Sequence, residues 1–223
     1  MEEKIIKSKQ RIVDFGEVNT NSNIVSSMVD LVNIEFEKLD SRFLEPACGD
    51  GNFLCEVLKR KMESVKLKHS KQQVDYEKFS IQACSSIYGI EILDDNVLSA
   101  RNRLNEIFYN HYCKIFDELN KDIIESVKKI FELNIVQGDA LNFKCGKKLE
   151  RAIVLPEWSL IDNLLKRRDF AYKDFISYAP IDGPNLFSDL PVEIFACVFA
   201  STSGFTRNVI SAVLPRPEAT SLN

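Results

Sequence analysis

The sequence predicts an α/β fold with a doubly wound, mostly parallel sheet and helices on both faces. Three short apolar segments each end in or near an acid, at Glu45, Glu91 and Asp139. Helical patterns, with apolar residues three to four positions apart, follow the first two segments from Asn52 and from Asp94. Because parallel strands end at one edge of such a sheet, we expect the three acids to line a ligand-binding edge.

The remaining elements are predicted from the same periodicities. Asn21, Ser22 or Asn23 can cap an amphipathic helix over 24–32. Residues 59–79 are polar and rich in lysine, which is typical of a solvated helix face or of a basic nucleic-acid patch. The other expected elements are a polar helix over 111–132, strand four at 151–155, strand five within 192–200, and a strand or helical turn at 209–214.

Composition narrows the class of protein. The 223 residues, 45% of them hydrophobic, suffice for one domain over 1–223, with a motif-bearing core at 11–160 and a less regular part at 181–223. The net charge of −4 gives no support for nucleic-acid binding, although a local basic face or a basic partner would suffice for it.

Cysteine usage and hydropathy predict a cytoplasmic protein. The six cysteines are scattered without a Cys-x-x-Cys pair, so we expect free thiols in a reducing compartment and no metal site. The N-terminal segment has no apolar core typical of a signal peptide, and no apolar run has the length of a membrane span, so no contact with a membrane is expected.

The most informative stretch is 45–54, which reads Glu-Pro-Ala-Cys-Gly-Asp-Gly-Asn-Phe-Leu. Gly49 and Gly51 allow the backbone to turn tightly and to pass close to a ligand, and Asn52 can cap the helix that follows. The string resembles motif I of the adenine-specific DNA methyltransferases, which bind S-adenosylmethionine. The dinucleotide fingerprint fits less well, since its third glycine would fall at Leu54. An ordinary turn between strand and helix is the alternative.

A second segment supports this resemblance. Residues 15–20 end in Gly-Glu-Val-Asn-Thr and resemble motif X, which precedes motif I in the gamma-ordered members and closes over the methionine end of the cofactor. Asn21 stands where the family usually has proline.

The resemblance implies the methyltransferase version of the fold and a set of cofactor contacts. Glu91 is expected to accept hydrogen bonds from the ribose hydroxyls, and Asp139 from the amino group of the adenine. The implied cofactor-binding residues are Thr20, Glu45, Ala47, Gly49, Gly51, Phe53, Glu91, Ile92, Asp139 and Ala140.

The catalytic motif departs from the family. After strand four the family has Asn/Asp-Pro-Pro followed by Tyr or Phe, whereas this chain has Leu155-Pro156-Glu157-Trp158. The implied catalytic residues are Pro156, Glu157 as a hydrogen-bond acceptor, and Trp158 as a stacking face for a flipped base. Leu155 cannot act as an acceptor. The alternative for Trp158 is that it is a core residue. A basic cluster at 166–168 follows the motif, and it is expected to contact either phosphates or only solvent.

The functional hypothesis is methyl transfer from S-adenosylmethionine to adenine in DNA, by a modification methyltransferase or by the modification subunit of a restriction–modification system. Too few residues follow Trp158 for a target-recognition domain, so we expect the recognition element on another domain or subunit, with a specificity subunit or endonuclease as the partner. The alternatives are methyl transfer to a substrate other than DNA, and a non-catalytic cofactor-binding subunit.

Overall fold

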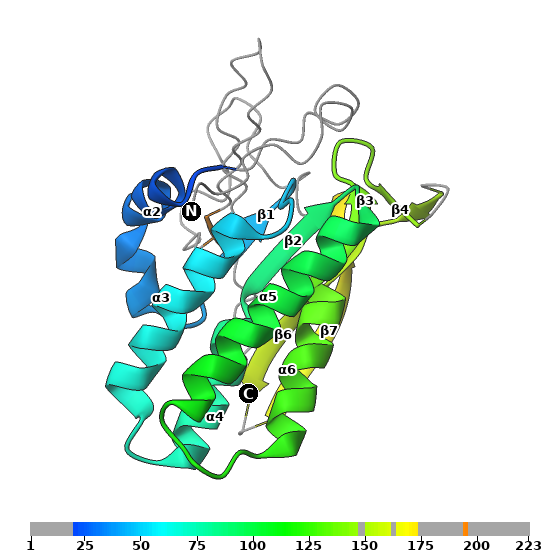
Figure 1. Cartoon of the computed structure of the whole chain (residues 1–223). Helices are drawn as coiled ribbons and strands as arrows, with labels where there is room; N and C mark the ends of the chain where they lie inside the picture. Colours follow the sequence, from blue (N-terminus) through cyan, green and yellow to red (C-terminus); the bar gives the residue numbers. More distant parts are fainter. Residues whose placement is uncertain (1–19, 147–149, 162–163, 174–193, 196–223) are drawn as a thin grey trace, which may run out of the picture.

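The computed structural model describes residues 20–146, 150–161 and 164–173, together with the backbone of 194–195. These residues form a six-stranded sheet in the order β5-β4-β3-β2-β1-β8 and a separate two-stranded sheet, β6-β7 (Figure 1). The α/β class predicted from the sequence is confirmed. The N-terminal segment at 15–19 and the apolar stretch at 209–214 lie outside the described residues.

The centre of the sheet contains the three predicted acid-terminated strands. β1 (Arg42–Glu45), β2 (Ile87–Glu91) and β3 (Ile135–Asp139) are parallel neighbours. β8 (Ile194–Phe195), which lies within the predicted strand five, pairs in parallel with the other side of β1. Beyond β3 the direction reverses, since β4 (Lys144–Cys145) and β5 (Arg151–Ala152) pair antiparallel to their neighbours.

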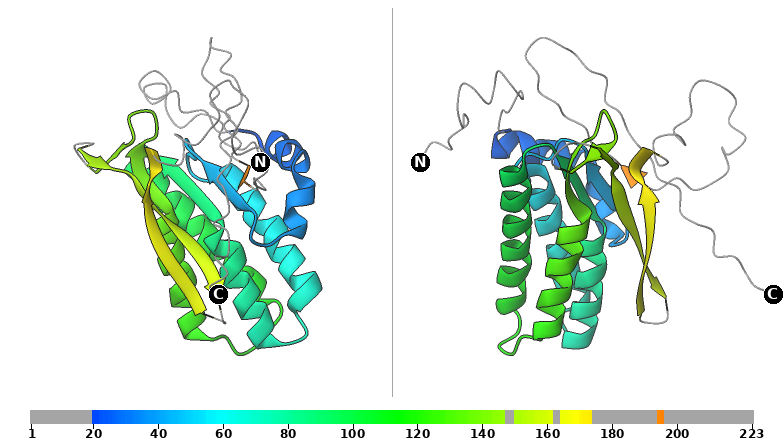
Figure 2. Two further views of the ribbon diagram at one scale, coloured as in Figure 1. Left: turned by 180° about the vertical axis from the view of Figure 1, so that it is seen from behind. Right: turned by 90° about the vertical axis from the view of Figure 1, so that its right-hand side faces the viewer.

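Helices cover one face of this sheet, as the two views of Figure 2 show. Phe43, Ile87 and Ile135 extend from the three central strands into the core that they share with these helices. The helices are α3 (Asn52–His69), α4 (Gln73–Ser85), α5 (Asp94–Cys113) and α6 (Lys121–Asn134).

The amino-terminal part of the described chain packs against α3. It consists of α2 (Ser22–Asp30), whose first turn is capped by the side chain of Asn21 at 2.8 Å from the amide of Asn23, and of the 3-10 helix η1 (Asn33–Glu37). Lys61 of α3 is fully buried and donates hydrogen bonds to the carbonyls of Leu39 and Ser41, at 2.9 and 2.7 Å. These bonds fix the chain immediately before β1.

The other face of the sheet differs from the prediction. Instead of helices, an antiparallel hairpin of β6 (Val154–Ile161) and β7 (Leu164–Ala171) covers it (Figure 2). Leu155 of β6 packs there in a second hydrophobic cluster with side chains of the central strands, among them Leu44 and Tyr88. The described residues therefore do not form a doubly wound sheet with helices on both faces.

The predicted strand four at 151–155 is divided between two strands. Residues 151–152 form the short edge strand β5, and Val154 begins β6. Within 151–155 only Ile153 and Leu155 are buried, and both belong to the second hydrophobic cluster, with Leu44 and Tyr88. No helix of the described residues is long and apolar enough to cross a membrane.

Candidate functional site

The carboxyl ends of β1, β2 and β3 bring the three predicted acids to one edge of the sheet, which lies at the top of Figure 1. Glu45 ends β1, Glu91 ends β2 and Asp139 ends β3. The loop that joins β1 to α3 lies at the same edge and contains both glycines of the motif.

Both glycines of this loop have a backbone conformation that side chains disfavour. Gly49 has φ +55° and Gly51 has φ +86°. A Cβ at position 49 would meet no atom of the described residues within 4 Å. A Cβ at position 51 would lie 3.0 Å from the Cβ of Ala100, because α5 passes directly against the loop.

Glu91 holds the loop from β2. Its Oε2 accepts a hydrogen bond from the amide of Gly49 at 2.9 Å, and its Oε1 accepts one from the amide of Leu93 at 3.0 Å. Each ionised carboxylate oxygen has about two lone pairs, so Glu91 retains capacity to accept from a ligand hydroxyl.

A third glycine, Gly89 in the middle of β2, lets the loop and α3 approach the sheet. A Cβ at this position would lie 2.8 Å from the Sγ of Cys48 and 2.9 Å from the Cδ1 of Leu54, and both of these side chains are buried. The position thus has no room for even one methyl group.

We expect Gly89→Ala to lower the free energy of unfolding by about 1–3 kcal/mol, the usual cost of overpacking a core. Denaturant unfolding measures this loss. Cys48→Ala makes room beside the new methyl group, so the double variant should be less destabilised than the two single variants predict together. Strictly additive losses would show that the methyl group does not meet Cys48.

Glu45 is the most unusual group of the edge. The residue is half-buried, but its Oε2 is buried and has no hydrogen-bond partner among the described residues. The pKa of this carboxyl is raised from 4.5 to about 8, with burial as the main cause and the negative charges of Glu91 and Asp50 as further contributions. A ligand that places a cation beside Glu45 would supply the missing partner and would favour the ionised form.

The start of α3 adds a site of opposite polarity. The residue before this helix is Gly51, and no side chain caps the first turn. The first amides of an α-helix have no partner within the helix, and together with the helix dipole they favour an anionic group. The edge therefore combines buried carboxylates with a helix N-terminus, a pattern suited to a ligand that carries both an ammonium and a carboxylate.

Asp139 lies at the same edge but is already engaged with its own loop. Its Oδ1 accepts from the amides of Leu141 at 2.9 Å and Asn142 at 3.2 Å, and its Oδ2 accepts from the side-chain amide of Asn142 at 2.5 Å. One lone pair of Oδ2 remains for a ligand. Ile92 and Leu141 are 37% and 70% exposed beside these acids, as apolar surface at the edge.

The other implied cofactor contacts are placed unequally. Ala47 is exposed in the loop and Ala140 is half-buried behind Asp139. Phe53, in the first turn of α3, is buried in the core. Thr20 is half-buried and is the first described residue of the chain.

The implied catalytic residues do not lie at this edge. β6 begins near the carboxyl end of β3 and runs back across the sheet, so Pro156, Glu157 and Trp158 lie within a strand. The indole Nε1 of Trp158 donates to the Oδ1 of Asn134 at 2.8 Å, and Asn134 immediately precedes β3. Trp158 is thus at the amino ends of the parallel strands.

Glu157 has a structural partner as well. It is buried, and its Oε1 lies 2.7 Å from the Nη2 of Arg42, the first residue of β1. Pro156 is buried next to it; proline is tolerated here because β6 has a strand partner on one side only. A base held at the carboxyl edge would therefore not reach Glu157 or Trp158.

The basic cluster at 166–168 lies on the exposed strand β7. Arg167 forms a two-pronged ion pair with Asp169, with both nitrogen–oxygen distances at 2.6 Å, and Arg168 lies over the ring of Phe170. The cluster is on the hairpin, on the side of the sheet away from the helices (Figure 2).

Sequence reasoning missed one residue of the site, Arg103 on α5. Its guanidinium contacts Asp50 and Asn52, on either side of Gly51. The spacing of three residues between Ala100 and Arg103 places both on one face of a helix, and it is the one sequence signal that could have indicated this contact.

No protein-family model matches the chain, and no match was found among the curated proteins or the solved structures.

Proposed function

We propose that the chain binds S-adenosylmethionine at the carboxyl edge of β1, β2 and β3, as the methyl-transfer part of a DNA adenine modification enzyme. The observation that carries the proposal is the buried Oε2 of Glu45, which has no partner in the described part of the chain and lies beside the loop that contains Gly49 and Gly51. The resemblance of 45–54 to motif I supplies the identity of the ligand.

The residues of the edge fit this cofactor. Glu45 would pair with the ammonium of its methionine part, and the uncapped start of α3 would accept the carboxylate. Glu91 would accept from the ribose hydroxyls, and the remaining lone pair of Asp139 would accept from the adenine amino group. Ile92 and Leu141 offer apolar surface for the adenine ring.

The chemistry itself demands little of the protein. S-adenosylmethionine supplies a methyl group on a positively charged sulfur, which is already activated for transfer. The protein has to hold the accepting amine in line with that methyl group and to exclude competing acceptors. The cofactor would be held by Glu45, Glu91 and the glycine loop. The proposed substrate is DNA, which a recognition element on another domain or subunit would present.

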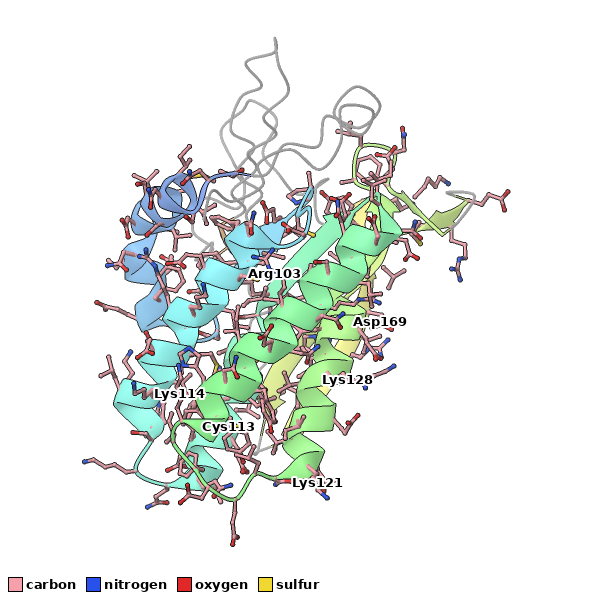
Figure 3. All side chains as sticks on the ribbon, viewed as in Figure 1. Arg103, Cys113, Lys114, Lys121, Lys128 and Asp169 are labelled. Atoms are coloured by element: carbon pink, nitrogen blue, oxygen red, sulfur yellow. The ribbon has the colours of Figure 1, made fainter. Side chains whose placement is uncertain are left out.

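Calorimetry of the full chain with S-adenosylmethionine and with its demethylated product, S-adenosylhomocysteine, tests the binding. We expect both to bind, and we expect Asp139→Ala to weaken binding by about 10- to 100-fold, because it removes the acceptor for the adenine amino group. Asp169→Ala, which removes an exposed aspartate of β7 (Figure 3), is the matched control and should bind like the wild type. If neither ligand gives a heat of binding, the edge is not a site for this cofactor.

One observation favours a second candidate, a cofactor-binding subunit without catalysis. Glu157 is paired with Arg42 and Trp158 is bonded to Asn134, away from the edge, so neither takes the role that the family motif has. Incubation with methyl-labelled cofactor and unmethylated plasmid DNA separates the two candidates. Label in adenine supports the enzyme, whereas tight binding without any transfer, also in the presence of a partner subunit, supports the non-catalytic role.

A further inference from the structure

We propose that Arg103 is a positioning residue of the ligand-binding edge. It fixes the loop 49–52 in its ligand-receiving conformation and keeps Asp50 paired, so that Glu45 and Glu91 alone face the cationic part of the ligand. The inference rests on the proposed function, because it assigns a role in binding that cofactor, but its structural part is tested without the cofactor.

The contacts of Arg103 span the whole turn. Its Nη1 donates to the carbonyl of Asp50 at 2.7 Å and lies 3.0 Å from the Oδ2 of the same residue. Its Nη2 donates to the Oδ1 of Asn52 at 2.7 Å. One guanidinium therefore holds the residues before and after Gly51, and only the planar fork of an arginine reaches both with correct geometry.

A second contact from the same helix face reinforces the first. Ala100 lies one turn before Arg103 on α5 and packs so closely on Gly51 that a Cβ there would meet it at 3.0 Å. Gly49, in turn, is held through its amide by Glu91 at the end of β2, directly before α5. Residues of β2 and α5 thus contact all four residues of the loop 49–52, and Arg103 provides the contact with the most hydrogen bonds.

The charge of Arg103 has its own consequence at the edge. Asp50 is one of the two carboxylates whose charge acts on Glu45, together with Glu91. Pairing with Arg103 offsets the charge of Asp50, so this carboxylate does not compete with Glu45 for the ligand cation. Loss of Arg103 would leave Asp50 as an additional free anion and would release the loop at the same time.

Figure 3 shows Arg103 on α5 near the start of α3, and Lys114 at the far end of the same helix. Arg103→Gln removes the charge and the fork, and Arg103→Lys keeps the charge but cannot bond both neighbours of Gly51 at once. Lys114→Gln removes an exposed cation that directly follows α5, without touching the loop, and it is the matched control. Asn52→Ala removes only the contact between Arg103 and the Oδ1 of Asn52, and it replaces Arg103→Gln as the test variant if that protein fails to fold.

Two measurements on the full chain decide the proposal. Amide hydrogen exchange without cofactor should be faster at residues 49–52 in Arg103→Gln, intermediate in Arg103→Lys and unchanged in Lys114→Gln. Calorimetry with S-adenosylhomocysteine should show binding about 10- to 100-fold weaker in Arg103→Gln, with partial recovery in Arg103→Lys.

The outcomes separate this inference from the proposed function. If the wild type binds and Arg103→Gln binds equally well with unchanged loop exchange, the positioning role is wrong and the function stands. If the wild type binds neither cofactor nor product, the function is wrong, and the exchange measurement alone then decides whether Arg103 holds the loop. If exchange in Arg103→Gln rises uniformly over the whole chain, Arg103 stabilises the fold in general and does not position the loop, and the inference is wrong.

Discussion

Trp158→Ala should lower the free energy of unfolding by about 3 kcal/mol and leave the cofactor affinity of the folded protein unchanged. Trp158 is the single tryptophan of the chain and packs against both hydrophobic clusters, one on each face of the sheet. The indole Nε1 also bonds Asn134, whose Nδ2 donates to the carbonyls of Ser85 and Ile87 at 3.2 and 2.9 Å. The substitution removes packing and leaves the buried Oδ1 of Asn134 without this donor.

Denaturant unfolding followed by circular dichroism measures the loss, since the substitution removes the intrinsic fluorescence probe. Tyr109→Ala, at an exposed aromatic of α5, should change stability by less than about 0.5 kcal/mol and controls for the loss of a ring. Trp158→Phe keeps most of the packing and should cost only about 1–2 kcal/mol, for the lost donor. If Trp158→Ala unfolds at the same denaturant concentration as the wild type but transfers methyl groups more slowly, Trp158 acts as a stacking residue after all.

The strands and the helix that follow local rules were predicted correctly. β1, β2 and β3 are short apolar runs, each ending in an acid, and they are parallel neighbours as expected. The helix from Asp94 ends at Cys113 with its predicted apolar face in the core. In these elements the sequence pattern and the tertiary environment agree, because a central strand and an amphipathic helix have one side each that must be buried.

The hairpin of β6 and β7 could not be distinguished from a parallel strand by its apolar residues alone. A run such as 151–155 is buried either inside a sheet or on top of one. A sequence signal nevertheless exists, since the runs 154–161 and 164–171 are separated by only two residues, the commonest spacing in a β-hairpin. The position of Trp158 then follows from the strand direction, which carries it away from the carboxyl edge.

The sequence predicted which acids meet at one edge of the sheet, but not the residues that surround them. Residue type and local order predicted Glu45, Glu91 and the loop, because each acid ends its own apolar strand and the glycines closely follow Glu45. The contacts of Arg103 and the pairing of Glu157 with Arg42 join residues that are far apart in sequence. Likewise, the missing partner of the Glu45 oxygen depends on how completely the fold buries it, which no local pattern shows.

The free energy of unfolding of the protein without ligand should fall as the pH rises from about 5 to 7, and Glu45→Gln should remove most of this fall. The carboxyl pKa of Glu45 is about 8 in the folded protein and is 4.5 ordinarily. Between these values the folded protein retains a proton that the unfolded chain has lost, so raising the pH favours unfolding. The stabilising contribution is complete below 4.5 and is lost as the pH passes through 8.

The size of the effect follows from the shift. Between pH 5 and pH 7 the free energy of unfolding of the wild type should fall by roughly 2–3 kcal/mol more than that of Glu45→Gln. Lys61 also makes the stability depend on pH, because burial lowers its pKa from 10.5 to about 7. Its contribution to the free energy of unfolding therefore rises between about pH 7 and pH 10.5. The contribution of Lys61 cancels when the wild type is compared with Glu45→Gln, since both proteins contain Lys61.

Denaturant unfolding at several pH values between 5 and 8 provides the measurement, with Glu106→Gln, at an exposed acid of α5, as the matched control that should follow the wild type. Saturating S-adenosylhomocysteine adds a second arm. Its ammonium should pair with ionised Glu45 and flatten the pH dependence of the wild type, whereas Glu45→Gln should gain less from the ligand, by about 1–3 kcal/mol. Parallel pH profiles of the wild type and Glu45→Gln without ligand would mean that the buried oxygen of Glu45 has a partner in solution, and the edge would then offer no unpaired carboxylate to a cationic ligand.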